Sequence, residues 1–266
     1  MKPLLPAALA ALLVPAVAYA QDEPRFCPNR PDLGASGCTT EPGHVQFEVS
    51  SVDWQRDDSA ETREDVVLGG NFQARIGLAS HTEVGIEWTP FGRARTRDKA
   101  TGAIERVSGV GDARIDIRQS LSHPDGEALS IGVEPFVTVP FGRGALGEGD
   151  WGAGVVLPLS YDVGDRWNLN LTFESDAAVD EDRSGRHLAY SGIVGVGYDL
   201  SDSLTIVGEV MTERDHDPSG HETHVLTAGS IAWQPRKGLQ LDVLTAVGLN
   251  RNTPDVRVLT GGTVLF

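Results

Sequence analysis

The stretch DVRVLTGGTVLF, residues 255–266, carries the plainest structural signal in the chain. Every second position back from Phe266 holds Val, Gly or Thr, whereas the opposite parity includes Asp255, Arg257 and Thr263. This period of two indicates a β-strand with one apolar face. A closed barrel in a bacterial outer membrane needs such a last strand, because it must pair with the first and leave no edge in lipid. The alternative is an edge strand of a soluble sheet.

The N-terminus has the form of a secretory signal. Lys2 supplies a positive charge, residues 3–17 are apolar, and Ala18-Tyr19-Ala20 is a small-residue cleavage site. We therefore predict a signal peptide over residues 1–20 and a mature chain that begins at Gln21. After it, no apolar run reaches the roughly 18 residues that a membrane helix needs.

Charge and cysteine content narrow the class further. The chain has 38 acidic residues against 22 Lys and Arg, a formal net charge of −16. Nucleic-acid partners are disfavoured, because an acidic chain without basic clusters cannot neutralise phosphates. Cys27 and Cys38 are the two cysteines, and in an exported protein they predict one structural disulfide. Redox or metal roles would need further ligands nearby. We expect residues 21–42 to form a disulfide-stapled periplasmic segment, and the sequence leaves open whether this segment plugs the lumen.

From residue 43 to 266 the pattern predicts about twelve strands and no amphipathic helix. Residues 112–118 are the clearest case, since Ala113, Ile115 and Ile117 alternate with four charged residues. Four charges on one face cannot enter an apolar core without a large desolvation cost, so they line a wet lumen or face solvent. A change of parity at Val52 predicts a bulge.

The links between these strands alternate in length. Short links are predicted at 79–82, 122–126, 162–166, 201–203 and 234–238, and longer polar links at 55–63, 96–108, 141–150, 176–187 and 213–222. Only the last long-side link, 251–254, is short. Such alternation is typical of a membrane barrel with periplasmic turns and external loops. Trp88 and Trp151 fall at predicted external strand ends and Trp167 and Trp233 at periplasmic ones, as two aromatic girdles would.

Several runs also resemble a known family. They are CPNRPDLGASGCTTEPG, GVGDARIDIRQSL, PFVTVPFG, GDWGAGVVLPLSYD, DEDRSGRHLAY and LNRNTPDV. These runs look like those of the outer-membrane transporter family of the phenol-degradation meta-pathway (MetA-pathway) type. The resemblance spans essentially Cys27 to Phe266. It implies a small barrel for uptake of hydrophobic or aromatic compounds, and it supplies no residue-level transport motif.

If the apolar parity faces lipid, the opposite parity gives a set of candidate lumen-lining residues. The set is Glu48, Arg75, Glu83, Glu87, Asp112, Arg114, Asp116, Arg118, Glu134, Glu174, Asp242 and Arg257. One interpretation is a charged constriction that selects solutes. The other is that these charges pair with one another and fill the interior, since twelve strands lie between filled and open barrels. Acids outnumber bases, which disfavours an anion-selective channel.

Metal binding and catalysis have weaker signals. Asp180, Glu181 and Asp182 could offer oxygen ligands to Ca²⁺, but their spacing matches no EF-hand loop. His216, His221 and His224 would need tetrahedral reach to bind zinc. No G-x-S-x-G motif occurs, and Ser203 lacks the glycine of a lipase-like block. We therefore expect no metal, no cofactor and no enzyme activity.

These observations favour a single transmembrane, antiparallel up-and-down β-barrel of about twelve strands at residues 43–266. The functional hypothesis is passage of a small, hydrophobic or aromatic solute across the outer membrane of a Gram-negative bacterium. Expected partners are membrane lipid, the solute, and the barrel-assembly machinery through the strand ending at Phe266. Two alternatives remain, namely a closed structural or adhesive barrel that acts through its acidic external loops, and a barrel hydrolase dependent on one serine.

Overall fold

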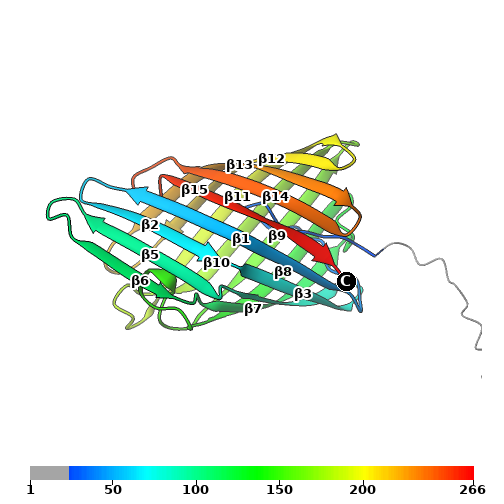
Figure 1. Ribbon diagram of the computed structural model, residues 1–266. Coiled ribbons are helices and arrows are strands. Elements are labelled where there is room, and N and C mark those ends of the chain that lie inside the picture. The colour runs from blue at the N-terminus through cyan, green and yellow to red at the C-terminus, as the bar shows by residue number, and fades with distance from the viewer. Residues whose placement is uncertain (1–23) are drawn as a thin grey trace, which may run out of the picture.

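Twelve antiparallel strands close into a barrel in the computed structural model, which describes residues 24–266 (Figure 1). The wall strands are β1 (Val45–Asp58), β3 (Asn71–Ala79), β4 (Thr82–Trp88), β7 (Ala113–Ser122), β8 (Leu129–Val139), β9 (Gly152–Val163), β10 (Trp167–Val179), β11 (Arg186–Ser201), β12 (Leu204–Asp215), β13 (Glu222–Arg236), β14 (Leu239–Gly248) and β15 (Val256–Leu265). Pairing of β15 with β1 closes the ring. The signal peptide predicted over residues 1–20 lies outside the described residues. Within residues 24–266, no helix has the length and apolarity that a membrane crossing requires.

The alternation of short and long links is confirmed for most of the wall. The hairpins at 79–82, 122–129, 163–167, 201–204 and 236–239 gather at the end where β1 begins and β15 finishes (Figure 1). We call this the hairpin end and the opposite end the loop end. The bulge predicted near Val52 is also confirmed, because the pairing of β1 with β15 shifts between Ser50 and Val52.

Side chains alternate across the wall as the period of two predicts. On β14, Leu241 and Val243 point outward and are 46% and 37% exposed, while Asp242 and Leu244 point inward and are buried. An outer surface this apolar is stable only against lipid, which is the surface that a transmembrane barrel presents. Inside, Leu244 and its buried neighbours form a small apolar cluster against Leu33. The rest of the buried interior is largely polar.

Three consecutive strands are each interrupted in the middle by a short non-strand segment, which the sequence did not predict. β2 (Thr62–Gly69) leads into β3, β4 leads into β5 (Phe91–Asp98), and β6 (Ile104–Gly109) leads into β7. Gly70, at φ +69°, makes the first break, and Pro90 lies at the second because it cannot donate to a ladder. The halves nearer the hairpin end belong to the ring. The other halves, β2, β5 and β6, pair with one another and with the last part of β1.

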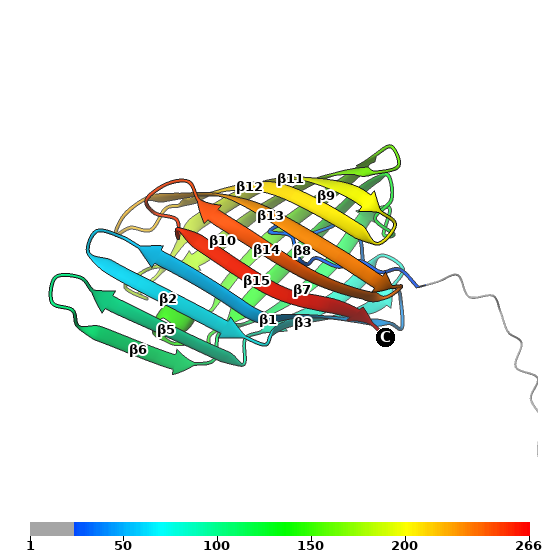
Figure 2. The same ribbon diagram turned by 45° about the horizontal axis from the view of Figure 1, so that its top comes forward.

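We call β2, β5 and β6 the side sheet; it extends the wall at the loop end (Figures 1 and 2). The long loop predicted at 96–108 is therefore wrong, since most of it is strand and only the turn at 99–103 is loop. Trp88 is the last residue of β4, as predicted, but it lies within the wall and not at the rim. Its indole Nε1 donates to the Gly111 carbonyl at 3.1 Å, and the wall continues beyond it through β5.

The loop between β8 and β9 folds against this side sheet. Its single 3-10 turn, η1 (Gly144–Leu146), places the Leu146 side chain where a Cβ on Gly92 would lie 2.7 Å from it. The Asp112 carboxylate accepts hydrogen bonds from the N–H groups of Gly142 at 2.6 Å and Glu148 at 2.8 Å. One predicted lumen residue, Asp112, thus fastens both ends of the loop.

Candidate functional site

Residues 25–42 run inside the barrel. We call them the plug. They belong to the segment 21–42 that the sequence predicts to be periplasmic, whereas the structure places them against the inner faces of strands all around the ring. Its contacts reach Glu83 on β4, Thr172 on β10 and Asp242 on β14. The predicted Cys27–Cys38 disulfide is present and closes a loop within the plug.

The plug has no strand partner over residues 27–38, so its backbone groups need side chains of the wall. Buried N–H groups that lack an acceptor are expensive, and carboxylates are strong acceptors. The Glu48 carboxylate accepts from the N–H of Arg30 at 2.9 Å, and Glu209 accepts from the N–H of Leu33 at 2.9 Å. Further along, the N–H of Ala35 donates to the Thr172 hydroxyl at 3.0 Å.

The carbonyl groups of the plug are met by donors from the wall in the same manner. Gln46 exchanges two hydrogen bonds with Cys27, accepting from its N–H at 2.9 Å and donating to its carbonyl at 2.8 Å. The Arg75 guanidinium donates to the same carbonyl. Arg118 donates to the Cys38 carbonyl at 3.2 Å. The charged side chains of the lumen therefore bind a peptide segment and do not simply face water.

The same arginines join a buried network of ion pairs. Arg75 lies 2.6 Å from Glu48 and 3.0 Å from Glu83, and Arg118 lies 3.4 Å from Glu83 and 2.6 Å from Glu134. All five side chains are at most 4% exposed. This pairing and hydrogen bonding offset the large desolvation cost of so many buried charges. The network crosses β1, β3, β4, β7 and β8 and ties them to the plug.

The other predicted residues divide between pairing and the open part of the lumen. Arg114 stacks on the Phe136 ring, with its guanidinium carbon 3.5 Å from the centroid, and reaches Glu174 at 3.5 Å. Arg257 pairs with Asp53 at 2.5 Å, across the junction of β15 and β1.

Asp242 pairs with Arg30 of the plug at 2.7 Å. Glu87 accepts from the Asn71 amide at 3.1 Å. Asp116 is 1% exposed, and neither carboxylate oxygen has a hydrogen-bond partner among the described residues.

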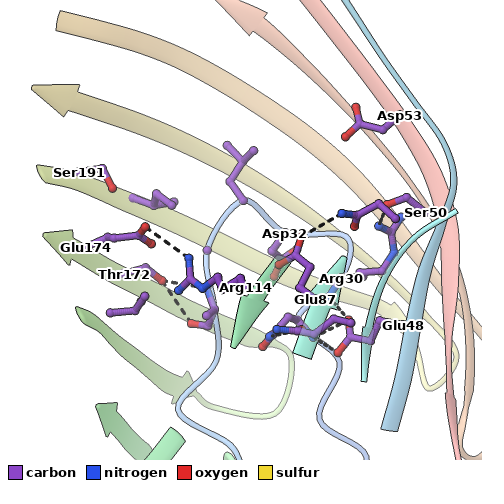
Figure 3. A pocket seen from close by; sticks show the side chains of 18 of the residues that line it. Arg30, Asp32, Glu48, Ser50, Asp53, Glu87, Arg114, Thr172, Glu174 and Ser191 are labelled. Carbon is purple, nitrogen blue, oxygen red and sulfur yellow. Dashed lines mark hydrogen bonds and ion pairs between the residues drawn. The ribbon is translucent and has the colours of Figure 1, made fainter. Parts of the chain in front are cut away.

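Among the cavities inside the barrel, two lie beside the plug. The larger, about 650 Å³, lies between the plug and the loop end and is lined by Arg30 and Asp32 of the plug and by Arg114 and Glu174 of the wall (Figure 3). The smaller, about 330 Å³, lies at the hairpin end of β11 to β14, with Gln240 in its lining. Because Gln240 also donates to the Arg30 carbonyl at 2.6 Å, the plug lies between the two cavities.

The two residue groups weighed above as metal ligands do not come together as units. At the loop end, Asp180 is joined instead by His187 and Asp217, with ligand atoms within 4.8 Å of one another. The His187 ring pairs with these carboxylates, since its Nδ1 lies 2.9 Å from Asp180. Of the three histidines, His216 and His221 stack with ring centroids 4.9 Å apart, and His224 faces Glu222 at 3.6 Å.

Four residues whose side chains bind the backbone of the plug were not predicted from the sequence. They are Gln46, Thr172, Glu209 and Gln240. The inward orientation of Glu209 could be predicted, because Glu209 has the same parity as Glu213 on the same strand. Gln46 and Gln240 likewise occupy inward positions, but an uncharged amide between apolar neighbours does not stand out in a sequence.

Comparison with known proteins agrees with this architecture. A family model described as "Putative MetA-pathway of phenol degradation" matches residues 28–266. The chain belongs to this family. The match covers the barrel of this phenol-degradation family member and nearly the whole plug. No curated protein matches the chain.

Solved structures share the fold at low identity. A NanC porin superposes with a TM-score of 0.52 at 8% identity, covering 83% of this chain and 98% of the porin. The translocator domain of the autotransporter NalP from Neisseria meningitidis superposes with a TM-score of 0.50 at 11% identity, covering 85% of this chain and 90% of that domain. Both are similar in fold alone. The phenol-degradation family member therefore has an outer-membrane β-barrel fold.

Proposed function

We propose that the barrel passes a small hydrophobic or aromatic solute across the outer membrane, and that the plug gates this passage. The observation that carries the proposal is the arrangement of two cavities on either side of the plug. A polar interior with a lipid-facing apolar exterior suits a route for solutes. Membership of a family described by phenol degradation supports an aromatic solute.

The larger cavity has the size and character of a small-molecule site. Its volume of about 650 Å³ lies within the range of roughly 300–1,000 Å³ in which ligand pockets fall. Ile193, Met211 and Leu259 supply apolar surface, while Arg114 and Glu174 supply polar groups. An aromatic ring that carries one hydroxyl needs this combination of an apolar wall and a few hydrogen-bonding groups.

The plug is suited to move because separate side-chain hydrogen bonds, and not a β-ladder, attach it to the wall. Over residues 27–38, every hydrogen bond to the wall involves a wall side chain, while backbone contacts are confined to the C-terminal part, at Thr39 and Pro42. Hydrogen bonds to separate side chains can break one at a time, whereas the hydrogen bonds of a β-ladder break cooperatively. Elements of low local stability of this kind supply the moving parts of binding proteins. The disulfide keeps the plug itself compact when it moves.

The test is a reversible lock between the plug and the wall. An ideal Cβ on Gly34 lies 3.5 Å from the Thr172 Cβ, within the span of roughly 3.5–4.5 Å found in disulfides. Gly34→Cys with Thr172→Cys should therefore cross-link in the oxidised, refolded protein, with peptide mass mapping to confirm the pairing. We expect uptake of phenol and benzoate into proteoliposomes to stop when the lock is oxidised and to resume on reduction.

Wild-type protein treated with the same reductant is the matched control, because it reports the effect of opening Cys27–Cys38 alone. Equal solute flux through the oxidised and reduced lock would refute gating by the plug. A folded barrel that passes no solute in either state, in wild type and lock alike, would refute the transport proposal and favour a closed structural or adhesive barrel.

A further inference from the structure

The outward face of the side sheet gathers arginines that are scattered in the sequence. Residues directly opposite in antiparallel strands share a face, and one such row across β1, β2, β5 and β6 reads Arg56, Asp65, Arg95 and Arg106. The next row reads Asp58, Arg63, Arg97 and Ile104, and the row on the other side reads Trp54, Val67, Arg93 and Ser108. One face thus holds six arginines and two aspartates.

This face points away from the lumen. The intervening residues on the same strands face inward, since Asp53 and Leu68 line the larger cavity and Ala94 is only 2% exposed. A Cβ on Gly92 would meet Leu146 of the loop that covers the sheet from inside. Side chains of opposite parity must therefore face outward.

The positive charges on this face are poorly neutralised by the protein. Arg63 stands directly opposite Arg97, and Arg95 directly opposite Arg106. Like charges in such positions destabilise a sheet unless something else compensates them. Asp65 is shared, at 2.7 Å from Arg56, 3.6 Å from Arg63 and 3.9 Å from Arg95.

The second aspartate is already paired elsewhere. Asp58 lies 2.5 Å from Lys99, in the turn between β5 and β6. Arg93, Arg97 and Arg106 are exposed, and within residues 24–266 none has an ion pair or a side-chain hydrogen bond. An external anion with several oxygens would remove the repulsion, because guanidinium groups bind phosphate in a bidentate manner.

The position of the face on the barrel identifies the anion. The outward residues of the wall between the side sheet and the hairpin end, on β3, β4 and β7, are apolar and exposed, such as Leu78, Ile86 and Ile117. The arginines begin where these apolar residues end, beyond the breaks at Gly70 and Pro90. In a membrane barrel this boundary lies at the lipid headgroups. Arg56 also lies over the Trp54 ring, at 4.9 Å, as interfacial side chains do.

We propose that the side sheet binds the phosphate groups of the outer-leaflet glycolipid, with Arg93, Arg97 and Arg106 as the principal ligands. The three guanidinium groups present their donors toward the headgroup layer, and Arg95 and Arg63 add charge. Binding would anchor the loop end of the barrel in the leaflet. It would also stabilise the outer edge of β6, which pairs with no further strand among residues 24–266.

The test compares two triple variants of the full-length refolded protein in detergent. Arg93→Gln, Arg97→Gln and Arg106→Gln together remove the proposed ligands. Arg143→Gln, Arg183→Gln and Arg251→Gln remove the same charge from exposed loop positions at the same end. Affinity for bisphosphorylated lipid A is measured by native mass spectrometry, beside dephosphorylated lipid A and inorganic phosphate. Heat-modifiable mobility confirms that each variant is folded.

We expect the side-sheet variant to bind lipid A roughly 100-fold more weakly than wild type, from about fivefold for each of the three basic residues near an anionic surface. The loop variant should lose less than about threefold. Equal loss in the two variants would overturn the proposal, as would equal affinity for dephosphorylated lipid A. Salt-sensitive dimerisation lost only in the side-sheet variant, with unchanged lipid A binding, would overturn it in favour of a second copy of the chain.

Discussion

Glu209 is the wall residue whose loss should release the middle of the plug. Its carboxylate accepts hydrogen bonds from the N–H groups of Leu33 at 2.9 Å and Gly34 at 3.3 Å. A hydrogen bond to a charged acceptor contributes about 1.5–3 kcal/mol, and the longer bond falls at the weak end of that range. Glu209→Ala also removes a buried charge without a cation beside it, which returns part of that energy. A net loss of about 2 kcal/mol remains, so the population of undocked plug should rise roughly 30-fold.

Hydrogen exchange of the refolded protein measures this population directly. Peptides that cover residues 33–35 should exchange roughly 30-fold faster in Glu209→Ala than in wild type, because docking protects these amides. Glu213→Ala is the matched control, since Glu213 faces inward from the same strand and has no hydrogen bond to the plug. Unchanged exchange in Glu209→Ala, or equal acceleration in both variants, would show that side-chain acceptors do not hold the plug.

Three further outcomes follow from the same contacts. Arg118→Met removes the nearer cation of the buried Glu134 carboxylate, at 2.6 Å, and leaves Arg114 at 3.3 Å, so it should cost about 3 kcal/mol in urea unfolding, the low end for a broken buried pair, whereas Arg118→Lys should cost less. Asp112→Ala frees the loop that it fastens, so trypsin should cut after Arg143 at least tenfold faster, while a cleavage rate equal to wild type would contradict that role. Burial, together with the nearby carboxylates of Glu209, Asp242 and Glu48, raises the pKa of Asp32 to about 8. A raised carboxyl pKa stabilises docking at low pH, and this contribution is lost as pH rises through 8. The protection factor of the plug amides, which is exchange corrected for its intrinsic rise with pH, should therefore fall from pH 6 to 9 in wild type but not in Asp32→Asn.

The wall could be predicted from sequence because its signal is local. Alternation along β7 or β14 shows which side chains face lipid without knowledge of any partner strand. Gly70 and Pro90 permit the breaks at their positions, but neither residue shows whether a strand or a loop follows the break. Only the pairing of β2 with β5 settles that β5 and β6 are strands.

The plug could not be predicted because its contacts are not local. Its residues have no periodicity, and Arg30 meets Asp242 at a separation of 212 residues. Inward charges were identifiable from parity, but parity does not show what a charge binds. The arginines of the side sheet were missed for the same reason. Arg93, Arg95 and Arg97 alternate with small or polar residues, so a basic cluster appears only when β2 and β6 lie beside β5.

The plug also changes which residues could select a solute. A peptide that crosses a lumen without strand partners presents N–H groups, and Glu48, Glu83 and Glu209 accept from them. Substitutions at these acids should alter how often the plug undocks before they alter which solute passes. Selectivity should instead reside in side chains that line the larger cavity and do not bond to the plug, among them Arg114 and Glu174. A screen that mixes the two groups would mistake a change in gating for a change in specificity, because both alter the flux of a single test solute.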